Sequence, residues 1–352
     1  MVYKTKKILF VSEYLDPPYD EGIKKTVFQL YQILDQRFDI SVICRKGPGA
    51  KGNIDAFNCN RLFLSRKVKK RIKSFSPDLT IYFPFASSTF AAFLRHFILS
   101  HYHATANNLM IALQPKPLRK WQEKIVKIFF RPAIVLTPSP LLKQRLENIS
   151  INTVLIPLLT DLSFFKPVDT RERKKQLRKK YGIPLDSYVI IHVGHLNQGR
   201  NLSGLIPLQS DSVQVVIVGS SSTPEDARGP GTLKKELEDH GIIVIDRYIQ
   251  SIDEIYQLSD LYVFPVKDQN SSIGLPLSIL EARACGRPVL TTDYGSVKEF
   301  LGDDYGGIYY SEPENFADAI KSIQRNNSKN ETKTNVYRLN HMFYEIIQQA
   351  IG

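Results

Sequence analysis

Short apolar runs recur along this chain, and they fall into two successive series. The first comprises residues 7–12 ("KILFVS"), 39–44, 78–83, 109–113, 133–137 and 153–157, and the second residues 187–194, 213–219, 242–246, 260–265, 287–292 and 306–310. Runs of this length are typical of strands buried on both faces of a parallel sheet. Between them lie segments with apolar residues at helical spacing, as in residues 25–34. The pattern predicts an α/β protein with two doubly wound parallel-sheet, Rossmann-like domains.

A charged segment at 169–183, "DTRERKKQLRKKYGI", separates the two series. We expect an N-terminal domain over residues 1–165, a C-terminal domain over residues 166–332, and a final helix over residues 333–352 that returns toward the N-terminal domain. Two such domains joined by one linker form a cleft, and ligands of parallel sheets lie at the carboxyl ends of the strands. Functional residues are therefore sought in the loops that follow strands.

The composition sets limits on location and redox chemistry. The longest apolar candidate for a membrane span, residues 89–99, is far shorter than the roughly 20 residues that a bilayer requires, and it contains Arg95. The first residues are basic, but their apolar run is too short for a signal peptide. These features predict a cytoplasmic protein. Its three cysteines match neither a disulfide framework nor a zinc site.

The net charge of +12 predicts a polyanionic partner, and nucleic acid, an anionic membrane surface and phosphorylated substrates all fit it. Residues 116–132 mix Lys and Arg with Trp121 and Phe129, which suits a helix lying on anionic lipid at the inner face of the membrane. The alternative is an amphipathic helix that packs Trp121 and Phe129 on the sheet and leaves a solvated cationic face. No nucleic-acid recognition motif accompanies the charge, so no nucleic acid is expected.

Two loops after predicted strands carry candidate anion-binding residues. Gly22 precedes the first helix, where it lets backbone N–H groups approach an anion, although a plain capped loop fits equally well. His195 and Arg200 lie in "GHLNQGRNL" (194–202), where a flexible backbone and a cation suit a diphosphate. The alternative for Arg200 is an ordinary surface arginine. Four acidic residues of the first loop either contact an acceptor or are simply solvated: Glu13, Asp16, Asp20 and Glu21.

A third loop, "VKDQNSSIGLP" (266–276), runs into a helix that we expect to begin near Leu275 or Pro276. The backbone of Ile273, Gly274, Leu275 and Pro276 forms an anion site by geometry. Glu281 lies one to two turns into the helix, where it faces either solvent or the cleft. A carboxylate beside bound phosphates is repelled unless it accepts hydrogen bonds from hydroxyls, and a ribose supplies such a pair. We therefore expect Glu281 to hold the nucleotide's sugar while the turn holds its phosphates.

These loops carry a family resemblance. The segment that runs from "VGHLNQGRN" through "VQVVIVGSS" to "DLYVFPVKDQNSSIGLPLSILEARACGRPVLTTDYGSVKEF" resembles the C-terminal half of GT-B glycosyltransferases of family 4, which are retaining and sugar-nucleotide dependent. In the N-terminal half, "EGIKKTVFQL" resembles the family's Gly-loop helix more loosely. The resemblance implies the GT-B fold, in which two Rossmann-like domains face a cleft.

Several positions depart from the family pattern. The family's two glutamates, separated by seven residues, correspond to Ile273 and Glu281. Because an isoleucine side chain cannot hydrogen-bond a sugar hydroxyl, we expect Asp268, Asn270 or the backbone to bind the transferred sugar.

The remaining departures affect the diphosphate and the reaction centre. The family's Arg and Lys, which clamp the diphosphate, read His195 and Arg200 here. Its catalytic-position His in the N-terminal domain reads Gln114, which can orient a hydroxyl but cannot shuttle a proton. Base selection is expected near Arg247 and Tyr248.

The resemblance implies a glycosyltransferase that moves a sugar from a nucleotide-diphosphate donor to a glycan or lipid-linked acceptor with retention of configuration. The nucleotide sugar is a co-substrate, and neither a cofactor nor a metal ion is implied. Two alternatives stay open. One is a catalytically impaired GT-B subunit that acts as a partner or regulator, which Ile273 and Gln114 suggest, and the other is a nucleotide-sugar epimerase of the same architecture.

Overall fold

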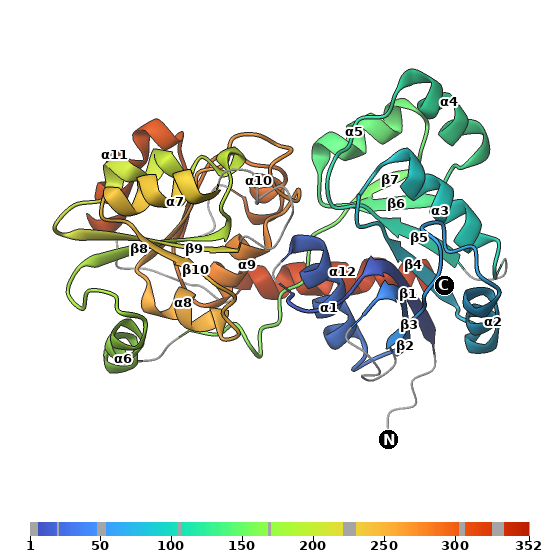
Figure 1. Ribbon diagram of the computed structural model, residues 1–352, viewed down its shortest axis with the longest axis horizontal. Coiled ribbons are helices and arrows are strands. Elements are labelled where there is room, and N and C mark those ends of the chain that lie inside the picture. Colours follow the sequence, from blue (N-terminus) through green and yellow to red (C-terminus); the bar gives the residue numbers. More distant parts are fainter. Residues whose placement is uncertain are drawn as a thin grey trace. The chain divides into compact units, whose positions relative to one another are not determined.

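The computed structural model of the chain describes residues 6–19, 21–47, 54–103, 107–167, 170–220, 230–302, 307–325 and 334–351. The chain divides into two compact units (Figure 1). Unit 1 comprises Met1–Leu159 and Asn340–Gly352, and unit 2 comprises Thr160–Leu339. Each unit contains one wholly parallel sheet, so the predicted α/β class with two doubly wound sheets is confirmed.

Unit 1 is built on a seven-stranded sheet in the order β3-β2-β1-β4-β5-β6-β7. The six predicted runs each form a strand, and the register pairs Val11 with Ile43 on one side and with Tyr82 on the other. The short edge strand β3 was not predicted, because its three residues, "IDA", hold no apolar run. The strands are β1 (Lys7–Tyr14), β2 (Asp39–Lys46), β3 (Ile54–Ala56), β4 (Leu79–Phe83), β5 (Asn107–Ile111), β6 (Ile134–Thr137) and β7 (Thr153–Leu155).

Four helices of unit 1 pack against one hydrophobic cluster and so form one layer over the sheet. They are α2 (Arg66–Phe75), α3 (Phe90–Ser100), α4 (Lys120–Phe129) and α5 (Pro140–Asn148). The cluster joins Val68, Phe93, Val126 and Leu142 from these helices to sheet residues such as Val11. Because parallel crossovers are right-handed, α1 (Gly22–Leu34) covers the opposite face. The apolar segment at residues 89–99 falls largely in α3.

Unit 2 is built on a six-stranded sheet in the order β10-β9-β8-β11-β12-β13. Its strands are β8 (Tyr188–His195), β9 (Val213–Ser220), β10 (Ile243–Asp246), β11 (Leu261–Phe264), β12 (Val289–Thr291) and β13 (Ile308–Tyr310). Its helices are α6 (Arg171–Tyr181), α7 (Pro230–Asp239), α8 (Ile252–Leu258), α9 (Leu277–Ala284), α10 (Val297–Leu301) and α11 (Phe316–Arg325). Short 3-10 helices η1 (Gln198–Arg200), η2 (Leu202–Leu208) and η3 (Pro313–Asn315) complete it. The charged segment at 169–183 contains α6, and the two units divide at Leu159, whereas the sequence predicts the boundary at residue 165.

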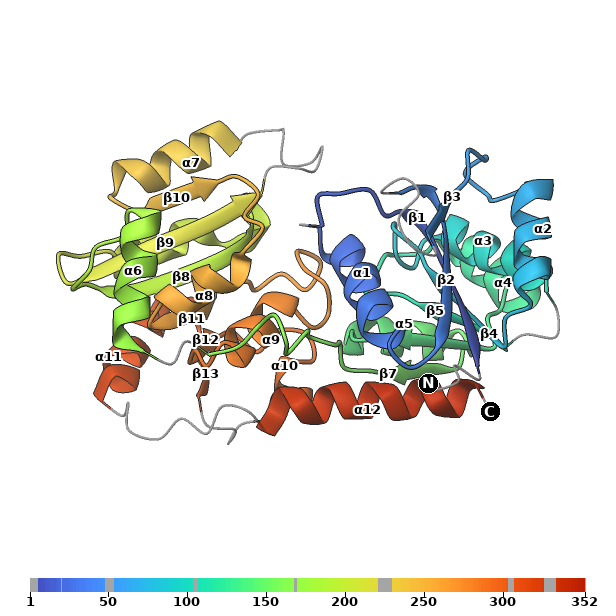
Figure 2. The ribbon, with the colours of Figure 1, turned by 90° about the horizontal axis from the view of Figure 1, so that it is seen from below.

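The last helix, α12 (Thr334–Ile351), begins in unit 2 and ends in unit 1 (Figure 2). In unit 1, the side chain of Asn107 donates to the carbonyl oxygen of Ala350 at 2.9 Å. The guanidinium of Arg37 lies 4.3 Å from the centre of the Tyr344 ring. These contacts attach α12 to β5 and to the turn between α1 and β2.

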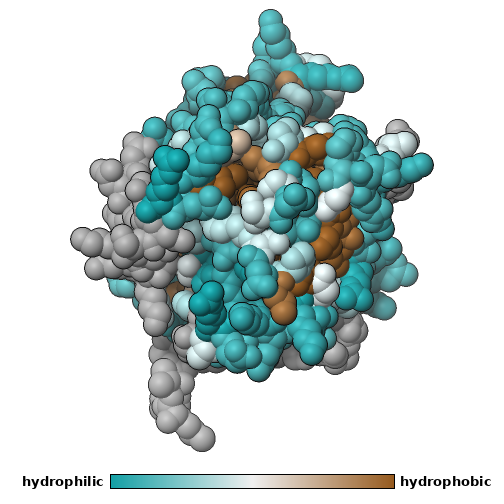
Figure 3. Space-filling model, turned by 90° about the vertical axis from the view of Figure 1, so that its left-hand side faces the viewer, coloured by the Kyte–Doolittle hydropathy of each residue, from teal (hydrophilic) through white to brown (hydrophobic). Residues whose placement is uncertain are grey.

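Hydrophobic residues are gathered mainly in the interiors of the two units. Figure 3 shows a face that is mostly hydrophilic, with hydrophobic side chains in patches. Within the described residues, no helix combines the length and apolar character that crossing a bilayer would need.

Candidate functional site

The sheet of unit 2 has a switch point between β8 and β11. From β8 the chain continues to β9 on one side, whereas β11 lies on the other side. Loops that leave adjacent strands in opposite directions open a crevice at their carboxyl ends, and ligands of open α/β sheets bind there. The two loops at this point are residues 196–201 after β8 and residues 265–276 after β11. Both were singled out from the sequence.

The loop after β11 is held in place by the residues that follow β12. The backbone N–H of Ser272 donates to the hydroxyl of Tyr294, which donates back to the Ser272 carbonyl, each at 2.9 Å. The carbonyl oxygen of Gly274 accepts the N–H of Ser296 at 2.9 Å. Gly295 has a φ of +57°, and a Cβ atom there would lie 1.9 Å from the Gly274 oxygen. Only glycine allows this approach, so the two segments are locked together.

This locked loop leaves backbone donors at the start of α9. Among the described residues, no protein acceptor takes the N–H groups of Ile273, Gly274 or Leu275. Helix α9 begins at Leu277, with Pro276 as its N-cap residue and no side-chain cap. Unpaired N–H groups and the positive end of a helix favour an anion. The arrangement suits a phosphate group, as the loop sequence predicts.

Arg200 lies close to this switch point. It ends η1 and is 8% exposed, so it is not an ordinary surface arginine. A Cβ atom at Gly194 would lie 3.7 Å from its Nη1 and 3.0 Å from Nε2 of His192. The absent side chain of Gly194 therefore makes room for both groups.

His192 is a site residue that sequence reasoning missed. Its Nδ1 lies 3.0 Å from the carbonyl oxygen of Val263, and its Nε2 has no hydrogen-bond partner among the described residues. Burial lowers the pKa of His192 to about 3, and the nearby Arg200 cation acts in the same direction. The imidazole is therefore neutral, with its proton on Nδ1. Its signal in the sequence is a polar residue inside the apolar run 187–194.

The two loops contact each other. His195 is the half-buried last residue of β8, and it leads into the loop that holds Arg200. A Cβ atom at Gly199 would lie 2.3 Å from the hydroxyl oxygen of Ser271, so a larger residue here would displace the Ser271 side chain. The candidate diphosphate residues His195 and Arg200 and the turn at 273–276 thus belong to one neighbourhood of unit 2.

Glu281 does not face solvent, which is one of the two orientations that its place in the sequence leaves open. It is fully buried, and its Oε2 accepts a hydrogen bond of 2.8 Å from the hydroxyl of Tyr256. The physical reason is that α9 is covered on nearly all sides, so its polar position meets α8 rather than water. Burial raises the pKa of Tyr256, and the neighbouring Glu281 carboxylate adds to the effect. The hydroxyl therefore stays protonated and donates.

The other donor-site candidates lie in exposed turns. Asp268 accepts hydrogen bonds from the backbone and side chain of Asn270, each at 3.0 Å, and from the hydroxyl of Ser271 at 3.0 Å. The hydrogen bond from the Asn270 N–H lowers the pKa of Asp268. The Asp268 carboxylate thus already holds its own loop. Arg247 and Tyr248 are exposed and follow β10, at the carboxyl edge of the same sheet.

In unit 1, the loop after β5 is tied to the loop after β4. The N–H of Gln114 donates to the hydroxyl of Ser87 at 2.8 Å, and the Gln114 carbonyl accepts from the hydroxyls of Ser87 and Ser88. The Gln114 side chain is half-buried. Gly22 begins α1, but the Glu21 carboxylate already accepts the N–H groups of Ile23 and Lys24. The capped loop is therefore what forms at Gly22, and an anion there would meet a carboxylate.

The remaining acidic candidates of the first loop have structural contacts. Glu13 is 2% exposed and pairs with Arg95 at 2.6 Å, so it is neither solvated nor open to an acceptor. Asp16 pairs with Lys24 at 3.3 Å. Asp20 lies outside the described residues.

Comparison with known proteins finds similarity in the domain that carries the switch point. The family description "Glycosyl transferases group 1" matches residues 173–338, which fall within unit 2. A Bacillus subtilis protein described as a teichuronic acid biosynthesis glycosyltransferase is 30% identical over 175 residues, which cover 48% of this chain and 41% of that protein. A D-inositol 3-phosphate glycosyltransferase of Geodermatophilus obscurus is 27% identical over 188 residues, or 49% of this chain and 40% of that protein.

Solved structures resemble the whole chain. The Anabaena protein HepE in complex with UDP-glucose is 17% identical, with a TM-score of 0.73 over 98% of this chain and 100% of that chain. A glycosyltransferase from Rickettsia africae is 16% identical, with a TM-score of 0.75 over 98% of both chains. At this identity the likeness shows the fold, which is GT-B.

Proposed function

We propose that this GT-B chain, in which residues 173–338 match the group 1 glycosyltransferases, transfers a sugar from a nucleotide diphosphate to a glycan or lipid-linked acceptor. The alignments with curated relatives cover only about two fifths of those proteins, 41% and 40% for the two named above. We therefore argue the function from the residues of this chain and not from those proteins. The nucleotide sugar serves as co-substrate, without a cofactor or metal ion. Transfer with retention of configuration is part of the proposal, on the strength of the family resemblance.

The observation that carries the proposal is the switch point of unit 2. The buried Arg200 supplies positive charge, and the N–H groups of residues 273–275, which have no acceptor within the described ranges, supply hydrogen-bond donors in the same neighbourhood. In glycosyl transfer, negative charge develops on the departing diphosphate, and preorganised donors of this kind stabilise it. A fold neighbour was solved with UDP-glucose, which supports a nucleotide-sugar donor for this chain.

The neutral His192 has a positioning role in this proposal. It lies beside Arg200, and a charged imidazole there would repel the guanidinium. Because burial keeps the ring neutral, Arg200 remains the cation offered to the diphosphate. In our proposal Glu281 binds the ribose, and its carboxylate accepts hydrogen bonds from both the ribose and Tyr256, because the bond from Tyr256 is already made.

To test the proposal, the wild-type protein is incubated with a panel of nucleotide sugars, including UDP-glucose and GDP-mannose, and the products are measured. A transferase without acceptor releases free nucleotide diphosphate slowly, an epimerase returns an isomerised sugar, and a non-catalytic subunit does neither. We expect slow release with one donor, and we expect Arg200→Ala to weaken binding of that donor. Gln198→Ala, an exposed neighbour on the same turn, is the matched control. Binding that is equal in Arg200→Ala and Gln198→Ala would remove Arg200 from the site.

We also propose that α4 contacts an anionic membrane surface, as the sequence of residues 116–132 predicts. Trp121, Ile128 and Phe129 are 51%, 69% and 62% exposed, so Trp121 and Phe129 are not packed on the sheet as the alternative would have it. Exposed cations of the same helix flank them at Lys120, Lys124 and Lys127. Apolar side chains beside cations are the pattern of a helix that lies in a bilayer interface.

Co-sedimentation with vesicles tests this contact. We expect the protein to sediment with phosphatidylcholine vesicles that contain phosphatidylglycerol, and much less with phosphatidylcholine alone. The double substitution Ile128→Ser and Phe129→Ser should reduce the bound fraction, because it removes exposed apolar area without changing charge. Leu185→Ser, which changes an exposed leucine of unit 2 that is 45% exposed, serves as control. Equal sedimentation with both kinds of vesicle would refute the contact.

A further inference from the structure

We propose that the pocket between α4 and α5 binds the sugar-phosphate head group of a membrane lipid, so that the acceptor is lipid-borne. This inference rests on the proposed function and names its acceptor class. The pocket lies wholly within unit 1 and has a volume of about 490 Å³. Small-molecule sites occupy roughly 300–1,000 Å³, so one or two sugar rings fit.

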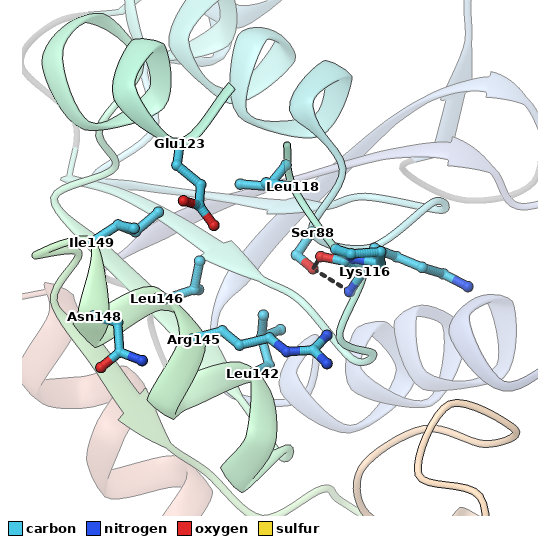
Figure 4. A pocket seen from close by; sticks show the side chains of 10 residues that line it. Ser88, Lys116, Leu118, Glu123, Leu142, Arg145, Leu146, Asn148 and Ile149 are labelled. Atoms are coloured by element: carbon cyan, nitrogen blue, oxygen red, sulfur yellow. Dashed lines mark hydrogen bonds between the residues drawn. The ribbon is translucent and has the colours of Figure 1, made fainter. Parts of the chain in front are cut away.

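Aliphatic side chains form much of the pocket wall. Figure 4 shows Leu118 and Leu146 directed into the space, with Ile149 on one side and Leu142 below. Leu142 and Leu146 are nearly fully buried, so this part of the wall is rigid. The half-buried Leu118 and Ile149 keep surface for the C–H face of a sugar ring, because that contact removes apolar area from water.

Polar groups stand around this apolar wall. Glu123 points into the pocket from α4, and Arg145 extends from α5 toward the side where Ser88 and Lys116 lie (Figure 4). A carboxylate accepts hydrogen bonds from ring hydroxyls, whereas guanidinium and ammonium groups bind phosphate. Arg145 is the cation nearest this space, because Figure 4 shows the Lys116 side chain extending away from Glu123. The pocket therefore suits a hydroxylated ring that carries a phosphate.

The position of the pocket on α4 favours a lipid as the source of this ring. Trp121 and Glu123 are two residues apart, which turns them about 200° around the helix, so the exposed apolar side chains and the pocket lie on opposite flanks of α4. The helix with its side chains is roughly 10 Å across. A lipid whose chains lie beside Trp121 and Ile128 can therefore present its head group to Glu123. A free sugar phosphate would need the pocket but not the exposed apolar residues.

The test compares two lipids of equal charge. Phosphatidylinositol carries a ring of hydroxyls on its phosphate, and phosphatidylglycerol does not. We expect wild-type protein to bind phosphatidylcholine vesicles containing phosphatidylinositol several-fold more strongly than those containing phosphatidylglycerol. The double substitution Glu123→Gln and Arg145→Gln leaves the net charge unchanged and should abolish this preference. Glu147→Gln, on α5 but outside the pocket, should keep it.

Each outcome decides one part of the inference. A wild type without the preference, or a double variant that retains it, would overturn the pocket assignment. Free inositol 1-phosphate that binds as tightly as the vesicles would overturn the lipid source. Donor hydrolysis by the wild type, measured without lipid, reports separately on the proposed function. A protein that hydrolyses donor but shows no preference loses this inference alone. One with the preference but no donor turnover keeps the head-group site and loses the transferase proposal, and with it the lipid's role as acceptor.

Discussion

Gly295→Ala should damage the proposed donor site, because the Gly295 backbone lies against the turn at residues 273–276. The φ of Gly295 is +57°, and a Cβ atom would lie 1.9 Å from the carbonyl oxygen of Gly274. That oxygen also accepts the N–H of Ser296 at 2.9 Å. A methyl group at this point must push the Gly274 peptide away, and with it the neighbouring amides at residues 273–275.

The cost has two parts. A left-handed backbone costs a residue with a side chain roughly 1–2 kcal/mol. Displacing the Gly274 carbonyl removes the Ser296 hydrogen bond, which contributes about 1 kcal/mol. Gly295→Ala should therefore lower the free energy of unfolding by about 2–4 kcal/mol, since the steric contact adds to both. It should also weaken binding of UDP-glucose about tenfold or more, because each lost hydrogen bond to a charged phosphate contributes roughly 1.5–3 kcal/mol.

Gly182→Ala is the matched control for this substitution. Gly182 has a similar φ of +68°, but nothing lies within 4 Å of its Cβ position. It should lose only the backbone part, about 1 kcal/mol, with no change in ligand affinity. Urea unfolding and calorimetric titration with UDP-glucose measure both quantities. Equal loss of stability in the two variants, with unchanged affinity, would show that the contact between residues 274 and 295 does not shape the site.

Three further predictions concern α4, an ion pair and a buried imidazole. Trp121 is the sole tryptophan of the chain, so its fluorescence should shift to shorter wavelength when anionic vesicles are added, and an unshifted spectrum would argue against membrane contact at α4. Asp260→Asn should lower the free energy of unfolding by about 2 kcal/mol at pH 7, because Lys174, Arg178 and the Val189 N–H all bind the carboxylate. Burial opposes these partners but does not prevent them from lowering the pKa of Asp260. In urea titrations the difference from wild type should therefore shrink as the pH falls below about 4. Because the pKa of His192 is lowered to about 3, the unfolded chain binds a proton below about pH 6.5 that the folded chain does not bind. The free energy of unfolding should therefore fall by up to about 1.4 kcal/mol per pH unit as the pH decreases from there. His192→Phe should flatten this slope in the same titrations, and an unchanged slope would mean that the imidazole is not excluded from protonation.

The fold was predictable because its signal is local. Strands buried on both faces read as apolar runs, and their number and order along the chain fix a doubly wound sheet with little further information. The exception, β3, is a three-residue edge strand with one buried residue, and such a segment has no pattern to detect. The helix start at Leu277 lies one to two residues beyond the predicted one, within the usual uncertainty of helix ends.

The loops of the site were also predictable, but the surroundings of their side chains were not. Sequence places Glu281 on a helix and Arg200 after a strand. It does not reveal that Tyr256, 25 residues earlier, meets the Glu281 carboxylate, or that His192 lies beside Arg200. Likewise, the capping of α1 by Glu21 depends on a backbone turn that the residue types permit but do not require. Contacts between distant segments decide these cases.

Our proposal requires that a nucleotide diphosphate bind unit 2 at the carboxyl ends of β8 and β11. A crystal structure of the protein with UDP would show whether it does. We expect phosphate oxygens within hydrogen-bonding distance of the amides of residues 273–275 and of the Arg200 guanidinium. A nucleotide bound elsewhere, or phosphates that reach neither the turn nor Arg200, would contradict it.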